Sequence, residues 1–208
     1  MSDHHSDPAA DWHRLKPDTA IAVGGVLDLL RNGDAQDDAQ NLLDAYLYAK
    51  RLLAESMQAL VRTGLPVESD TFRDLRAQLA ARMAEEYGDR IPERYLTVPY
   101  GSRTHEELFS MLLRRFKQPV SAALLRVVTR DSVHTERRTR ELRELGLDIV
   151  PSREGGSDVY TLRSLELDTS LIPTIITNNL RDKKASEQEK KAAAAVISGQ
   201  ADCELAPL

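Results

Sequence analysis

Apolar residues recur at helical spacing through three segments of the first 90 residues. Within each segment they return every three or four residues, as on one face of an α-helix. The helices are expected between Pro17 and Asn32-Gly33, between Asp34 and Gly64, and between Ser69 or Asp70 and Gly88. Three such helices can bury a common face, so residues 17–90 are predicted to form a helical bundle, a scaffold or dimerisation surface. A specific partner-binding or second DNA-reading domain stays open as the alternative.

The segments on either side of this predicted bundle lack helical periodicity. Residues 1–16 combine His, Asp, Ser and Pro with little apolar content, which predicts a disordered tail. Residues 91–102 contain Pro92, Pro99 and Gly101, which favour turns, and we predict a linker there.

Residues 103–165 contain three shorter helical segments followed by alternating strand-like sequence. We expect helices at residues 104–117, 122–130 and 132–145 and strands at 147–150 and 158–162. The strands flank Gly155-Gly156, which predicts a hairpin. Three helices and a hairpin describe a winged helix-turn-helix, whose third helix enters the DNA major groove while the hairpin, or wing, approaches the backbone. The predicted fold is therefore mainly α, with a helical bundle followed by an α+β winged helix.

The facing of two of these helices follows from their apolar residues. In the first helix Leu108, Met111, Leu112 and Phe116 are expected to point inward. In the third helix, Leu142 and Leu145 would face the core and bring Thr135 or Thr139 inward. His134, Arg137, Arg138 and Glu141 would then point outward in varying degree.

Arginine, histidine, serine and threonine can bond phosphates or base edges, so the outward N-terminal half of this helix suits DNA contact. The candidate DNA-binding residues are Ser132, His134, Thr135, Arg137, Arg138, Glu141 and, in the wing, Arg153. Pairs such as Glu136 and Arg140 are equally typical of an ordinary solvated helix.

Composition and charge narrow the class of protein. The chain of 208 residues has a net charge of −5, but its arginines crowd between Arg126 and Arg143 while acidic residues outnumber basic ones in the first 90 residues. A DNA surface is therefore expected in the later segment. There is no apolar run of about 20 residues, so no membrane span is predicted. The single cysteine, Cys203, agrees with a reducing cytoplasm, and we expect a cytoplasmic, nucleoid-associated protein.

The segment from Asp131 to Ile149, DSVHTERRTRELRELGLDI, together with the Tyr160-Thr161-Leu162 end, resembles the winged-helix domain that precedes HNH nuclease domains in bacterial restriction endonucleases. The similarity covers about 60 residues. It implies that the domain recognises DNA in a restriction-related setting. An HNH site needs further histidines, yet no histidine follows His134, so the nuclease part is absent.

We accordingly expect no catalytic residues, no cofactor and no metal site, and residues 166–208 are predicted to be a charged C-terminal extension, a solvated helix or loose tail. The predicted function is double-stranded DNA binding as the recognition component of a restriction or phage-defence system. The expected partners are duplex DNA, a second subunit held through the N-terminal helices, and a separate nuclease subunit. The alternatives are a transcriptional regulator and a protein-interaction adaptor that uses the winged helix.

Overall fold

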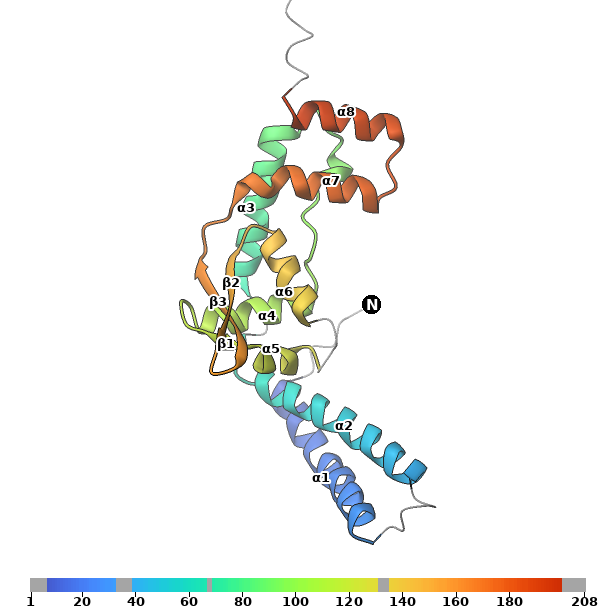
Figure 1. Cartoon of the computed structure of the whole chain (residues 1–208). Coiled ribbons are helices and arrows are strands. Elements are labelled where there is room, and N and C mark those ends of the chain that lie inside the picture. Colours follow the sequence, from blue (N-terminus) through green and yellow to red (C-terminus); the bar gives the residue numbers. More distant parts are fainter. Residues whose placement is uncertain (1–6, 33–38, 67–68, 131–134, 200–208) are drawn as a thin grey trace, which may run out of the picture. The chain divides into compact units, whose positions relative to one another are not determined.

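The computed structural model describes residues 7–32, 39–66, 69–130 and 135–199 (Figure 1). These ranges contain eight α-helices and one three-stranded antiparallel sheet, which confirms the predicted mainly helical fold with a small β component. The chain forms two compact units, one of residues 1–67 and 122–135 and the other of residues 68–121 and 136–208. A lipid bilayer could not be crossed by any helix of the described ranges, because none combines the required length and apolar character.

The first unit consists of two long helices and a short one: α1 (Pro8–Asn32), α2 (Ala39–Arg62) and α5 (Ala122–Val128). α1 and α2 lie side by side and run antiparallel (Figure 1). Their common core is made of small and aliphatic residues, namely Leu15, Ala22, Ala49, Leu52 and Ala59. Within this seam Thr19 Oγ1 lies 2.6 Å from Ser56 Oγ, so the two buried hydroxyls satisfy each other.

α1 begins at Pro8, so the predicted disordered tail and the predicted helix start at Pro17 are wrong for residues 8–16. The Asp7 carboxylate accepts a hydrogen bond from the Ala9 backbone N–H at 3.0 Å and thereby caps the helix. Trp12 then packs against the core of the first unit. Burial along α1 maintains the helix through Pro17, even though a proline inside a helix removes one backbone bond.

The second unit contains α3 (Asp70–Tyr87), η1 (Glu93–Tyr95), α4 (Arg103–Arg114), β1 (Val120–Ser121), all but the first residue of α6 (Thr135–Glu144), β2 (Asp148–Glu154), β3 (Ser157–Ser164), η2 (Thr169–Leu171), α7 (Ile172–Asp182) and α8 (Glu187–Ile197). The predicted succession of three helices and a hairpin is present as α4, α5, α6 and β2–β3, with the short strand β1 between α4 and α5.

α3 belongs to the second unit, which differs from the predicted bundle of residues 17–90. The rings of Phe72 on α3 and Phe109 on α4 lie 5.1 Å apart between centroids. The Ser69 backbone N–H donates to Glu106 Oε1 at 2.6 Å. The apolar face of α3 was predicted correctly, but helical periodicity does not identify which element covers that face.

The sheet has the order β1-β3-β2. Its hairpin closes with Glu154 paired to Ser157 around Gly155 and Gly156, whose φ angles are 55° and 81°. Positive φ at both central residues is what a type I′ turn requires, and glycine adopts it without steric cost. The predicted wing is therefore present, with strands longer than the sequence indicated.

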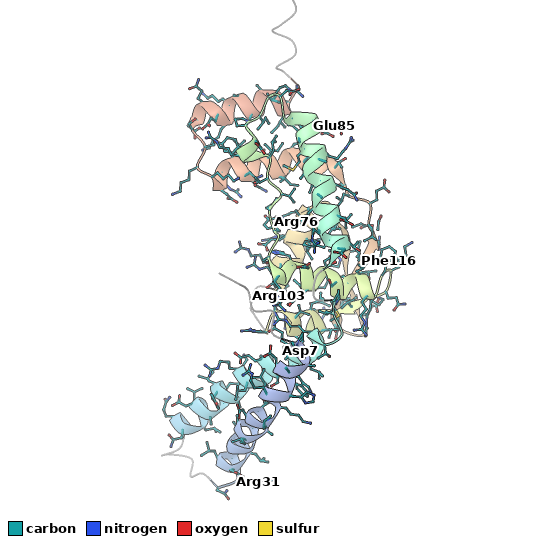
Figure 2. All side chains as sticks on the ribbon, turned by 180° about the vertical axis from the view of Figure 1, so that it is seen from behind. Asp7, Arg31, Arg76, Glu85, Arg103 and Phe116 are labelled. Atoms are coloured by element: carbon teal, nitrogen blue, oxygen red, sulfur yellow. The ribbon has the colours of Figure 1, made fainter. Side chains whose placement is uncertain are left out.

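α4 begins after Ser102 rather than with Thr104 as its cap, and it ends at Arg114. Leu108 and Leu112 are fully buried, as expected. Phe116 is 36% exposed instead of inward-facing (Figure 2), because it lies beyond the end of the helix, where helical spacing no longer applies.

The predicted charged, solvated extension at residues 166–208 is wrong for α7, whereas α8 agrees with it, because Ala193 is the one residue of that charged helix that is buried. Ile172 and Ile176 of α7 are 0% exposed. The Asn179 side-chain amide donates to the backbone oxygens of Tyr95 at 2.9 Å and Thr97 at 2.7 Å. The same contacts fix the segment predicted as a free linker, residues 91–102. α7 is thus part of the core of the second unit.

Candidate nucleic-acid interface

α6 presents one buried face and one exposed face within the second unit. Leu142 is 0% and Leu145 2% exposed, which confirms their predicted place in the core, and Thr139 is fully buried as well. The Arg137 side chain is 62% exposed and the Arg138 side chain 38%. The two arginines therefore reach the surface on the face opposite the core.

Glu141 does not point outward as predicted, because it is only 4% exposed. Its Oε1 accepts a hydrogen bond from Arg137 Nε at 2.9 Å, and its Oε2 accepts from Arg138 Nη1 at 2.8 Å. His105 Nε2 lies 2.8 Å from the same Oε2. A buried carboxylate is tolerated as an anion only when donors of this kind surround it. Glu141 is consequently a positioning residue for the two arginines.

The protonation states of this cluster follow from its geometry. Burial lowers the pKa of His105 below its ordinary value, against the raising effect of the hydrogen bond to Glu141. Burial alone would raise the pKa of Glu141, but the hydrogen bonds from His105, Arg138 and Arg137 hold it below its usual value. A neutral imidazole then donates from Nε2 to the carboxylate, and its Nδ1 accepts from the Ser102 hydroxyl at 2.6 Å.

The arrangement leaves a net positive charge with the cations outermost. Two guanidinium groups face one buried carboxylate, while His105 is neutral, so the cluster carries a formal charge of +1. Each arginine is held in one orientation by its bond to Glu141. An arginine fixed in this way loses less side-chain freedom when it binds a phosphate or a guanine edge.

Glu144, the next acidic residue on this helix, also has hydrogen-bonding and ion-pair partners. The Tyr100 hydroxyl donates to Glu144 Oε2 at 2.7 Å, and Arg140 Nε lies 3.6 Å from its Oε1. Burial, followed by the hydrogen bond to Glu144, raises the pKa of Tyr100 to about 12. The phenol therefore remains a neutral donor at neutral pH, and Glu144 opposes a phosphate less than an unpaired carboxylate would.

The chain of bonds from Ser102 through His105 to Glu141 has the residue types of a serine hydrolase triad. However, the His105 ring is only 2% exposed, and a catalytic histidine must pass a proton to the leaving group of a substrate. The geometry fits the positioning of Arg137 and Arg138 and does not fit proton transfer. Within the described ranges, no three His, Cys, Asp or Glu residues come together as a metal site would require.

The other candidate residues are placed as follows. Arg153 is exposed on β2, one pair before the wing turn, and its Nε donates to the Gly156 backbone oxygen at 3.3 Å. Thr135 is 3% exposed, and its hydroxyl lies 2.6 Å from that of Thr129. It therefore cannot reach into a DNA groove, and its prediction as a DNA-binding residue is wrong. Ser132 and His134 lie outside the described residues.

Sequence reasoning missed His105, Ser102 and Tyr100 as parts of the site. The available signal was weak, because Ser102 and His105 stand three residues apart at a helix start, and this spacing also occurs in ordinary capping arrangements. Their connection to Glu141 spans 36 residues of sequence, which no local pattern encodes.

Comparison with known protein families, with curated proteins and with solved structures found no match for this chain.

Proposed function

We propose that the protein is a non-catalytic double-stranded DNA-binding protein that contacts the duplex through α6 and the β2–β3 wing. The observation that carries the proposal is the exposed pair Arg137 and Arg138, held outward by the buried Glu141. Arg153 adds a cation next to the wing turn. Arginines on a third helix and on a following wing are the groups that a winged helix uses for base edges and phosphates.

The biological setting rests on the resemblance at residues 131–149. We place the protein as the recognition component of a restriction or phage-defence system, acting in the cytoplasm at the nucleoid with a separate nuclease subunit. We assign it no catalytic residue, cofactor or metal. The second candidate is a transcriptional regulator that binds DNA through the same surface. The third is a protein-interaction adaptor that presents Arg137 and Arg138 to an acidic partner.

The decisive variant is Arg137→Ala/Arg138→Ala. Fluorescence anisotropy with a labelled random-sequence duplex is expected to show a loss of affinity of at least about tenfold. If both arginines contact phosphates, the slope of log affinity against log salt concentration should fall by about 2. Because removal of two donors from the buried Glu141 should also lower stability, circular dichroism at the assay temperature must show that the variant is still folded and that the loss does not come from unfolding.

The matched control is Arg73→Ala/Arg82→Ala on α3. These arginines are 58% and 52% exposed, and they pair with Asp70 and Glu85, respectively. The control therefore removes the same charge from the same unit. We expect the control to bind DNA as the unchanged chain does. Equal losses in both variants would mean that overall charge, and not α6, governs binding. A salt-independent interaction would favour the adaptor.

Selection of bound sequences from a random duplex pool would define the target. The genes next to the target and next to the coding sequence then separate a defence component from a regulator. A target at the protein's own promoter would favour the regulator.

A further inference from the structure

The α1–α2 hairpin carries a second set of apolar side chains beside its buried seam. On α1, the positions directly after Ala22, Val26 and Leu29 are occupied by the exposed residues Val23, Leu27 and Leu30. On α2, each buried seam residue is likewise followed by an exposed one. One residue corresponds to about 100° around a helix, so these side chains form a stripe flanking the seam. We call this set of exposed residues the hairpin stripe, and its members are Val23, Leu27 and Leu30 of α1 and Leu43, Tyr46, Lys50, Leu53, Met57 and Leu60 of α2.

The α2 part of the hairpin stripe has the spacing of a heptad repeat. It consists of Leu43, Tyr46, Lys50, Leu53, Met57 and Leu60. The steps alternate between three and four residues, which is the pattern of a and d positions in helices that pack against another helix. Every apolar member of the α2 part is between 41% and 50% exposed. The apolar members of the pattern are therefore left partly open to solvent in the described part of the first unit.

The two helices contribute to one continuous groove. Val23, Leu27 and Leu30 line it from α1, and Tyr46, Leu53 and Met57 line it from α2. The groove has a volume of about 620 Å³, and α5 extends its lining through Ala123 and Val127. Charged groups reach it only through Lys50 and Arg126 among its described lining residues. A strongly charged partner segment is thus a poor match for this mostly apolar surface.

We propose that the hairpin stripe is covered by the hairpin stripe of a second copy of this chain. The α2 part is self-complementary in an antiparallel arrangement. About a two-fold axis midway between Lys50 and Leu53, Leu43 meets Leu60, Tyr46 meets Met57, and Lys50 meets Leu53 of the other copy. Each a position then faces a d position, and the same residues are used by both copies, as a closed two-fold dimer requires.

The exposed area is of the size that such a dimer needs. The eight apolar residues of the hairpin stripe are 40–64% exposed, which with ordinary residue areas gives roughly 750 Å² per copy when all of it is covered, and a stable interface of standard size uses about 800 Å² from each partner. Apolar patches of this extent on one face of a protein mark interaction sites. Lys50 is the single polar member of the α2 part of the hairpin stripe. One polar residue at an a position is a known means of fixing the register of two paired helices, at some loss of affinity.

The test is the mass of the full chain by size-exclusion chromatography with light scattering, at about 5 and 100 µM. We expect twice the chain mass of 23.3 kDa for the unchanged protein. Met57→Glu places a carboxylate opposite the Tyr46 ring in both halves of the dimer and should weaken the dimer at least about tenfold, giving monomer at the lower concentration. Lys50→Leu should strengthen the dimer and lower its dissociation constant.

Tyr48→Glu is the matched control, because Tyr48 is 51% exposed on α2 but does not line the groove. It should remain dimeric, and circular dichroism should show equal helicity in all variants. A monomeric unchanged protein at 100 µM overturns the proposal and leaves the groove to a different occupant. A dimer that resists Met57→Glu but dissociates with Tyr48→Glu overturns it as well. Neither result bears on DNA binding by α6, which is measured separately.

Discussion

A carboxylate with 4% exposure, such as that of Glu141, stays charged only because three side chains donate to it. Removal of one side chain from such a cluster leaves buried polar groups without a hydrogen-bond partner. The resulting loss of stability is larger than the net contribution of any single hydrogen bond. At this scale, the same residue supports the fold and orients the proposed DNA contacts. Substitutions in the cluster should therefore affect stability and DNA affinity together.

The pH dependence of stability is expected to report on His105. Its pKa is lowered in the folded protein, whereas an unfolded histidine takes up a proton near pH 6.5. The unfolded state thus binds more protons below about pH 6.5, so the stabilisation is complete above that pH and falls on acidification. Between pH 7.5 and 5.5 urea unfolding should show a loss of at most about 1.4 kcal/mol, the limit for one histidine that takes up no proton in the folded state. Glu141, with its lowered pKa, adds a further loss only below its unfolded value of 4.5.

His105→Gln should flatten this dependence between pH 7.5 and 5.5, because glutamine does not titrate yet can still donate to Glu141. His13→Gln serves as the control, since His13 is exposed on α1, and it should keep the acid-dependent loss. If the unchanged protein and His105→Gln lose the same stability over this range, the buried neutral imidazole is not the origin of the effect.

At the scale of single elements, α6 ends at Glu144, one residue before the predicted Leu145, and the predicted glycine with positive φ follows in the turn. Gly146 has a φ of 91°, and a Cβ atom there would lie 2.7 Å from the Asp168 backbone oxygen. The Gly146 carbonyl also accepts from the Asp168 N–H at 2.9 Å. The glycine therefore ends the helix and allows close approach of the segment that leads to α7.

Gly146→Ala should lower the free energy of unfolding by about 2 kcal/mol, because it adds a positive-φ penalty to a steric conflict with backbone atoms. Chemical denaturation monitored by circular dichroism gives the value. Gly25→Ala is the matched control. Gly25 lies inside α1 with nothing within 4 Å of an added Cβ, so alanine should be neutral or stabilise by up to about 1 kcal/mol. Equal destabilisation by both would contradict the role given to Gly146.

At the scale of the whole molecule, two units with separate cores are made from interleaved stretches of chain. The second unit depends on helices that follow the winged-helix elements in sequence. α7 buries Ile172, Ile175 and Ile176, and it fixes residues 95–97 through Asn179. Residues 103–165 are accordingly not a self-contained module, although the sequence suggested that they were.

A chain that ends at Ser164 should lose cooperative folding of the second unit, because the partners of these buried isoleucines are left exposed to water. Each large aliphatic side chain removed from a core costs about 2–5 kcal/mol, and the loss of several exceeds the stability of a typical domain. Thermal unfolding followed by circular dichroism tests this. A chain that ends at Gly199 keeps every described residue and should melt as the full chain does. Sharp melting of the shorter chain would refute the prediction.

The sequence by itself determined the six helical segments between residues 17 and 145 to within a few residues, and that a Gly-Gly turn joins two strands, because these features depend on neighbours a few residues apart. It also placed Leu142 and Leu145 in the core and Arg137 and Arg138 outside. Only the tertiary structure decided that Glu141 is buried, that α3 pairs with α4, and that α7 completes the second unit. These outcomes depend on contacts across 36 to 84 residues of chain, such as His105 with Glu141 and Tyr95 with Asn179, which no local spacing records.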